Sequence, residues 1–146
     1  MPLLNYTTSI SADKTINEIQ KCLAKNGARA IINEYDNQGY IIGLSFAIEL
    51  NGQKVGFKLP CDWRPVLQIL NNDSKVPRGL KTNEQALRVA WRIIKDWVEA
   101  QMAIVETKMV KVEQVFLPYA VQGNGRTLYD NVIESGMLLT SGNQSE

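Results

Sequence analysis

The chain has 146 residues, 45% of them hydrophobic and 21% charged, which is ordinary for a globular protein and does not favour disorder. No apolar run approaches the ~20 residues that a membrane span requires. It contains no histidine, which excludes catalytic triads and zinc sites that depend on imidazole. The two cysteines are too few for a disulfide framework, and residues 1–6 lack the pattern of a secretory signal, so we expect a cytoplasmic protein.

The first predicted element is a helix at residues 12–26, after an extended N-terminal stretch. Its apolar stripe begins at Ile16 and recurs at helical spacing. Thr15 begins a T-x-x-E capping box, and Ser11 is an equally good cap further upstream. Gly27 can supply the left-handed residue that ends the helix.

A meander of three strands follows, at residues 28–35, 40–50 and 53–59. Asn51-Gly52 is a preferred dipeptide for a two-residue hairpin, because both positions take a positive φ. This turn places Phe46 opposite Phe57, with Glu49 opposite Lys54 on the other face. Alternation along the second strand puts six residues on the apolar face: Tyr40, Ile42, Leu44, Phe46, Ile48 and Leu50. Helices must therefore cover that face of the sheet.

A short helix and a long helix come next. Asp62 can cap the short helix, and residues 71–80 have the composition of a loop. Thr82 and Gln85 have the spacing of a capping box at the start of the long helix, which we expect to reach residue 108. Three tryptophans lie in these helices, either as core anchors or as platforms on which a ligand stacks: Trp63, Trp91 and Trp97.

The C-terminal part is less regular. We expect a short apolar element at residues 112–117, a turn at residues 123–125, a helix from Thr127 to Ser135, and a flexible tail at residues 137–146. Together these elements predict a single α+β domain at residues 1–136. An N-terminal helix and a three-stranded antiparallel meander precede a short and a long helix, which pack on one sheet face.

No pattern of catalysis or metal binding is present. Cys22 and Cys61 lack the spacing of metal or redox sites, and we interpret them as buried or half-buried free thiols. Residues 123–127 superficially resemble a phosphate-binding turn, but they lack the full Walker spacing, which favours a plain turn. We therefore expect neither an enzyme nor a cofactor nor a metal. An enzyme that uses carboxylates alone is the alternative left open.

The charge pattern is more informative. Residues 75–95 hold six basic residues and one acid, within a chain whose net charge is +1. Arg88, Arg92 and Lys95 recur at i, i+4 and i+7 and share one helix face. This segregated patch predicts contact with phosphates or with an acidic protein surface. The alternative is a solvated helix face without a binding role. The candidate binding residues are Arg64, Lys75, Arg78, Lys81, Arg88, Arg92 and Lys95.

The segment EQALRVAWRIIKDWVEAQ at residues 84–101, together with FLPY at residues 116–119, resembles a family of small proteins of tailed phages and prophages. Lys14-Thr15 and residues 18–20 extend the likeness over most of the chain. The resemblance implies a viral accessory protein in the cytoplasm of a bacterial host, and it implies no site residues. The element order is also similar to that of double-stranded-RNA-binding domains and of single-strand annealing proteins, without their diagnostic motifs.

Two functional hypotheses follow from the cations and the resemblance. The leading one is a non-enzymatic phage protein that binds nucleic acid through the basic loop and helix. The second is an anti-defence protein that docks on an acidic host protein, or that sequesters a nucleotide messenger between the subunits of a homo-oligomer. Neither hypothesis requires a membrane.

Overall fold

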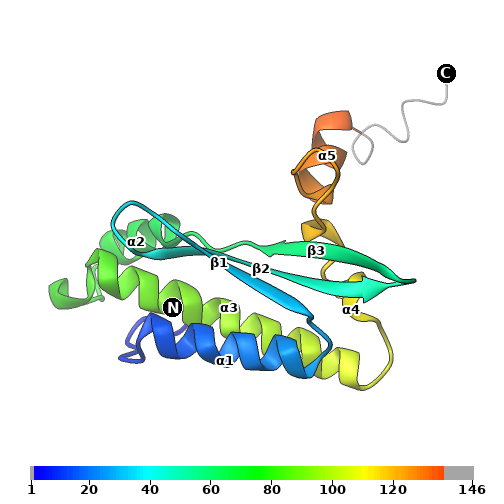
Figure 1. Cartoon of the computed structure of the whole chain (residues 1–146). Helices are drawn as coiled ribbons and strands as arrows, with labels where there is room; N and C mark the ends of the chain where they lie inside the picture. Colours follow the sequence, from blue (N-terminus) through cyan, green and yellow to red (C-terminus); the bar gives the residue numbers. More distant parts are fainter. Residues whose placement is uncertain (1, 137–146) are drawn as a thin grey trace.

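The computed structural model describes residues 2–136 and has the predicted order of a helix, a three-stranded sheet and further helices (Figure 1). β1 (Ala30–Tyr35), β2 (Ile41–Leu50) and β3 (Gln53–Leu59) form one antiparallel sheet in that order. The prediction of an α+β fold with an antiparallel meander is confirmed. The predicted tail at residues 137–146 lies outside the described residues.

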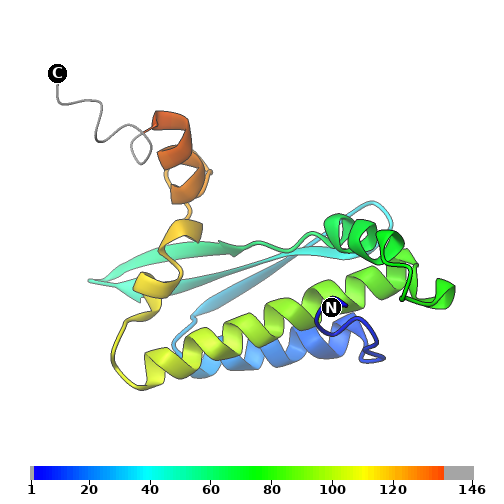
Figure 2. The same cartoon turned by 180° about the vertical axis from the view of Figure 1, so that it is seen from behind.

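Two long helices cover one face of the sheet. α1 (Ala12–Lys25) and α3 (Asn83–Glu106) run parallel and side by side beneath the strands (Figures 1 and 2). α2 (Trp63–Asn72) packs on α3, and η1 (Arg78–Leu80) lies in the loop between these two helices. Within residues 2–136, no helix is long and apolar enough to cross a membrane.

The C-terminal elements lie at the other end of the sheet. α4 (Val112–Val115) and η2 (Leu117–Tyr119) lead to α5 (Leu128–Ser135), which stands away from the helical layer (Figure 2). Between η2 and α5 the chain passes the outer edge of β3, where the Val121 N–H donates to the Gly56 carbonyl at 2.8 Å. This hydrogen bond brings α5 to the edge of the sheet, near the point where β3 ends.

The hairpin between β2 and β3 has the predicted register. Asn51 and Gly52 have φ values of 53° and 79°, as a two-residue turn requires. Phe46 pairs with Phe57, and their rings stack with centroids 5.3 Å apart. The Asn51-Gly52 turn and the apolar alternation from Leu44 to Leu50 therefore predict the observed register of this hairpin.

The N-terminal end of β2 differs from the prediction because it carries a β-bulge. Glu34 pairs with Gly43 but Tyr35 pairs with Ile41, so Ile42 is the extra residue. Ile41 is 4% exposed and Ile42 is 39% exposed. The prediction that Ile42 lies on the core face was wrong. The bulge turns Ile41 inward, where its carbonyl accepts a hydrogen bond from the Trp91 indole at 3.0 Å.

The helix caps confirm some predictions and correct others. Ser11 caps α1, since its hydroxyl accepts from the Lys14 N–H at 3.1 Å. Thr82 caps α3 by accepting from the Gln85 N–H at 3.1 Å, but the Gln85 side chain does not reach back to Thr82. Its amide nitrogen donates instead to the carbonyls of Tyr6 and Thr8, both at 2.9 Å. Only one of the two hydrogen bonds of the predicted capping box is therefore formed, and the Gln85 side chain instead holds the N-terminal segment against α3.

Candidate functional site

The cations predicted on α3 do not form an open surface. Arg92 lies against α1, where its Nη1 is 2.9 Å from Glu18 Oε1 and 3.3 Å from the Thr15 hydroxyl. Lys95 Nζ lies 3.0 Å from Glu99 Oε1 and 4.0 Å from Glu18 Oε1. The Arg92 and Lys95 side chains are only 14% and 15% exposed. The predicted face exists, but it belongs to the interface between α1 and α3.

Arg88 lies one turn before Arg92 and is half-buried. Its Nε donates to Gln85 Oε1 at 2.9 Å, the same side chain that holds the N-terminal segment. These three α3 cations thus make contacts within the protein. They leave little positive charge for a partner along this helix.

The three cations of the preceding loop are placed differently. Lys75 and Arg78 are exposed and Lys81 is half-buried, at the end of the molecule away from α5 (Figure 1). Within residues 2–136, their side chains make no hydrogen bond or ion pair. Val76 is 3% exposed and packs with Leu70 of α2, which anchors the loop that carries them. We call Lys75, Arg78 and Lys81 the loop cations.

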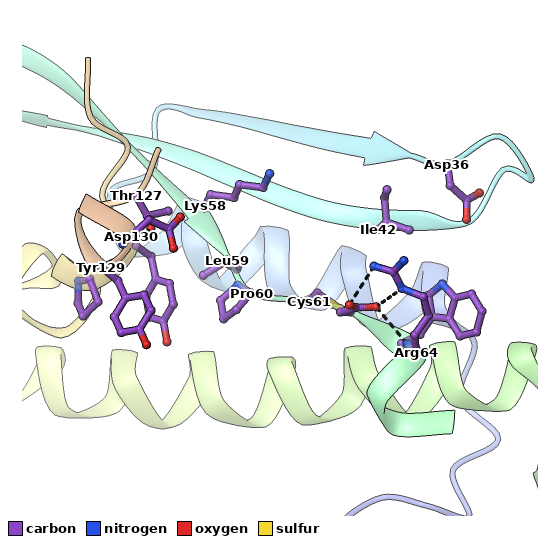
Figure 3. A pocket seen from close by; sticks show the side chains of 14 residues that line it. Asp36, Ile42, Lys58, Leu59, Pro60, Cys61, Arg64, Thr127, Tyr129 and Asp130 are labelled. Carbon is purple, nitrogen blue, oxygen red and sulfur yellow. Dashed lines mark hydrogen bonds and ion pairs between the residues drawn. The ribbon is translucent and has the colours of Figure 1, made fainter. Parts of the chain in front are cut away.

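A groove of about 780 Å³ lies on the β3 side of the molecule (Figure 3). The residues that line the groove come from four parts of the chain. They are Asp36 and Ile42, residues 58–64, Pro118 and Tyr119, and Thr127, Tyr129 and Asp130. Tyr129 and Asp130 lie at one end, and Arg64 and Ile42 at the other. The β-bulge contributes directly to this groove, because it directs Ile42 outward.

Two ion pairs lie along the groove. The Arg64 guanidinium donates two hydrogen bonds to the Asp62 carboxylate, at 2.9 and 3.0 Å. The Arg64 side chain thereby lowers the pKa of Asp62, and the pair raises the pKa of Arg64. Lys58 Nζ lies 3.7 Å from Glu34 Oε1 across the outer face of the sheet. Arg64 was predicted to bind phosphate, but its guanidinium group is already paired with the Asp62 carboxylate.

Asp130 and Asp36 contribute the remaining formal charge of the groove. Asp36 Oδ1 accepts hydrogen bonds from the Gln38 and Tyr40 amides, both at 2.9 Å, so it holds the turn between β1 and β2. Within residues 2–136, the Asp130 carboxylate accepts no hydrogen bond and makes no ion pair. The lining therefore combines three carboxylates with two cations, and Asp130 is the acid available to a ligand.

The rest of the lining is aromatic or apolar. Trp63, Tyr119 and Tyr129 provide three aromatic side chains, and Pro60 and Pro118 provide two proline rings. Tyr129 is 54% exposed, whereas the Tyr119 ring packs edge-on against Trp97 at 5.6 Å. The groove thus offers apolar area with a few polar groups, as ligand sites commonly do.

The Cys61 thiol lines the groove. Burial raises the pKa of the Cys61 thiol to about 12, so almost no thiolate is available at neutral pH. Within the described part of the chain, no cluster of three or more side chains is arranged to hold a metal ion. We find no activated nucleophile among these residues.

Sequence reasoning missed most of this site. Lys58, Tyr129 and Asp130 belong to no motif, and the FLPY segment that contains Tyr119 implies no site residue. Chain segments far apart in sequence bring these residues together. The sequence does place aromatic residues and prolines together at the ends of helices and strands. This clustering has no defined spacing, so it does not predict which ligand the residues bind.

Comparisons of this chain with protein-family models, with curated proteins and with solved structures find no match. The resemblance to phage and prophage proteins therefore stays a prediction.

Proposed function

We propose that this protein is a non-enzymatic binding protein whose ligand lies in the groove between the end of β3 and α5. One observation carries the proposal: three aromatic side chains and an available carboxylate surround a space of about 780 Å³. This volume lies in the range of about 300–1,000 Å³ that is usual for sites that enclose small ligands or short segments.

The neighbouring helix α5 supports the proposal. None of its residues is buried, and Tyr129 and Ile133 are 54% and 41% exposed. A helix that keeps apolar side chains in solvent at the wall of a groove gains stability when a ligand covers them.

Mapping with small organic probes tests the site without knowledge of the ligand. The labelled protein is titrated separately with phenol, isopropanol and acetamide, and amide and indole resonances are followed by NMR. We expect all three probes to shift the Trp63 indole resonance while the buried Trp91 resonance stays in place.

A matched pair of variants controls for surface effects. Ile42→Lys places a charge in the groove, whereas Ile32→Lys places it on the outer sheet face, where Ile32 is 63% exposed. Only Ile42→Lys should abolish the shifts. Probe shifts that gather elsewhere, or that survive in Ile42→Lys, contradict the proposal.

A second candidate function is binding of nucleic acid, which the loop cations favour. Lys75, Arg78 and Lys81 form a positive group on an anchored loop, which suits contact with phosphates. Three such contacts predict a loss of roughly 40-fold in affinity for duplex DNA between about 50 and about 200 mM salt.

Fluorescence anisotropy with single- and double-stranded DNA and RNA tests this second function. The variant Lys75→Ala/Arg78→Ala/Lys81→Ala is compared with Lys21→Ala/Lys54→Ala/Lys108→Ala, which removes three exposed cations elsewhere. We expect weaker binding and a smaller salt dependence in the first variant only. Equal effects of both variants, or no binding at low salt, reject nucleic acid as a partner. Inhibition of a host defence complex and capture of a nucleotide messenger stay predictions.

A further inference from the structure

We infer that the groove binds an extended peptide segment of a partner protein, one that contains proline and carries an arginine or lysine. This inference rests on the proposed function and names the class of ligand. It follows from three features of the groove: its aromatic walls, its charge, and the way in which β3 ends.

The walls fit a proline-rich segment. Such segments adopt the extended polyproline II conformation before they bind, so they lose little conformational entropy, and their rings pack on aromatic side chains. Trp63 is the first residue of α2, directly after the linker at residues 60–62, while Tyr119 and Tyr129 come from η2 and α5. An aromatic wall from several elements makes a rigid surface for successive ligand residues.

The charge of the groove selects a basic segment. Lys58 and Arg64 are paired with Glu34 and Asp62, whereas the Asp130 carboxylate makes no hydrogen bond or ion pair among residues 2–136. Arg126, which attracts Asp130 at longer range, is already paired with Glu134. An anionic ligand would meet a lining with one more carboxylate than cation, whereas a ligand guanidinium or ammonium can pair with Asp130. Tyr129 is adjacent in sequence and can add a cation–π contact.

The end of β3 excludes simple extension of the sheet at this place. The outer edge of β3 is engaged by Val121 at Gly56, and Pro60 has no N–H to donate to an added strand. A peptide in the groove would therefore be recognised through side-chain pockets more than through a continuous backbone ladder. This is the recognition mode that proline-containing ligands use.

The test uses a labelled decapeptide, Pro-Pro-Leu-Pro-Pro-Arg-Pro-Pro-Leu-Pro, and the full chain. Three further probes are compared: the peptide with glutamate for arginine, the peptide with alanine for every proline, and a single-stranded oligothymidine. Anisotropy gives affinities, and the Trp63 indole resonance reports binding at the groove. We expect the first peptide to bind, and both altered peptides to bind at least tenfold more weakly.

Variants of the protein locate the contact. Tyr129→Ala should lower the affinity for the peptide by roughly tenfold, because it removes an exposed aromatic anchor. Asp130→Asn should lower this affinity by roughly threefold, because it removes a surface charge. Tyr35→Ala and Asp13→Asn change an exposed tyrosine and an exposed aspartate outside the groove and should have no effect.

Three outcomes overturn the inference. The first is equal binding of the proline and alanine peptides, and the second is oligothymidine binding that Tyr129→Ala weakens, which would assign the groove to nucleic acid. The third is absence of peptide binding while phenol, isopropanol and acetamide still gather at Trp63; the groove would then bind another class of ligand and the proposed function would stand. If neither the peptide nor the small probes bind, the proposed function fails as well.

Discussion

Glu18 lies close to two half-buried cations of α3, Arg92 and Lys95. Its Oε1 lies 2.9 Å from Arg92 Nη1 and 4.0 Å from Lys95 Nζ, and its side chain is 34% exposed. A carboxylate on α1 thus neutralises cations whose spacing on α3 predicts a binding face. Charged side chains at a helix interface are paired because an unpaired, desolvated charge is costly.

We expect Glu18→Gln to lower the free energy of unfolding by about 1–2 kcal/mol, because Arg92 stays half-desolvated without its counter-charge. Urea denaturation measures the change. Glu49→Gln, on the exposed face of β2, should change it by less than about 0.5 kcal/mol. Similar small values for both variants would show that the Glu18 ion pairs are dispensable for stability.

The two thiols should differ in reactivity. Burial raises the pKa of Cys61 to about 12, and burial also raises the pKa of Cys22 above its ordinary value. Because the thiolate is the nucleophile, iodoacetamide at pH 8 should modify Cys22 before Cys61 in the native protein and both equally after denaturation. Peptide mass spectrometry gives the two rates, and faster labelling of native Cys61 would contradict the burial that its raised pKa reflects.

At the scale of elements, β2 changes the direction of its side chains at a bulge. The apolar run Tyr40-Ile41-Ile42 is compatible with either parity, and the alternation from Leu44 to Leu50 does not continue across the bulge to Ile42. The bulge makes Ile41 the buried residue, and the Ile41 carbonyl then accepts the hydrogen bond of the buried Trp91 indole.

This arrangement predicts losses of stability of very different size for two neighbouring substitutions. Ile41→Ala should cost about 2–5 kcal/mol of unfolding free energy, because it leaves a cavity beneath the sheet. Ile42→Ala should cost less than about 1 kcal/mol, because Ile42 is already 39% exposed. Chemical denaturation of both variants measures the difference, and a larger loss in Ile42→Ala would contradict the bulge.

The β1–β2 hairpin contacts the start of α3 through a hydrogen bond from the Tyr40 hydroxyl to Glu84 Oε2, at 2.9 Å. The pKa of Glu84 is lowered by its own backbone N–H and by this hydroxyl, and the pKa of Tyr40 is raised by the same bond. A lowered carboxyl pKa contributes stability above the unfolded value of 4.5, and this stability is lost as the pH falls through the folded value.

In Tyr40→Phe we expect the Glu84 pKa to rise part of the way toward its ordinary value, because the backbone contribution remains. An NMR titration of the Glu84 carboxyl carbon measures it, with the Glu113 carboxyl as an internal reference. An unchanged Glu84 pKa would show that this hydrogen bond is not populated in solution.

At the scale of the whole molecule, the two candidate surfaces lie apart. The loop cations lie beyond α2, and the groove extends toward α5 (Figures 1 and 3). The buried residues of the core beneath the sheet come mainly from α1, β2, β3 and α3, and Leu59 and Trp63 belong both to the groove and to this core or its margin. Tyr129 and Asp130 line the groove without belonging to the core, so substitutions there can alter binding separately from folding.

A chain that ends at residue 126 tests this separation. Because no residue of α5 is buried, we expect cooperative unfolding with a midpoint lowered by less than ~4 °C. Binding of the proline peptide should be lost, because Tyr129 and Asp130 are removed. A chain that ends at residue 136 is the control, and loss of cooperative unfolding in the shorter chain would show that α5 supports the core.

By itself, the sequence determined the order of elements, the hairpin register and most caps. Positive φ at Asn51-Gly52, alternation in β2 and side-chain caps such as Ser11 and Thr82 act over a few residues, so short-range patterns contain them. The tertiary structure alone decided which cations are free, which isoleucine is buried and which residues line the groove. Each of these depends on what a distant segment places opposite: Glu18 for Arg92, the Trp91 indole for Ile41, and α5 for the end of β3. Pairing and burial are properties of contacts across the fold, and a linear pattern records only one partner of each contact.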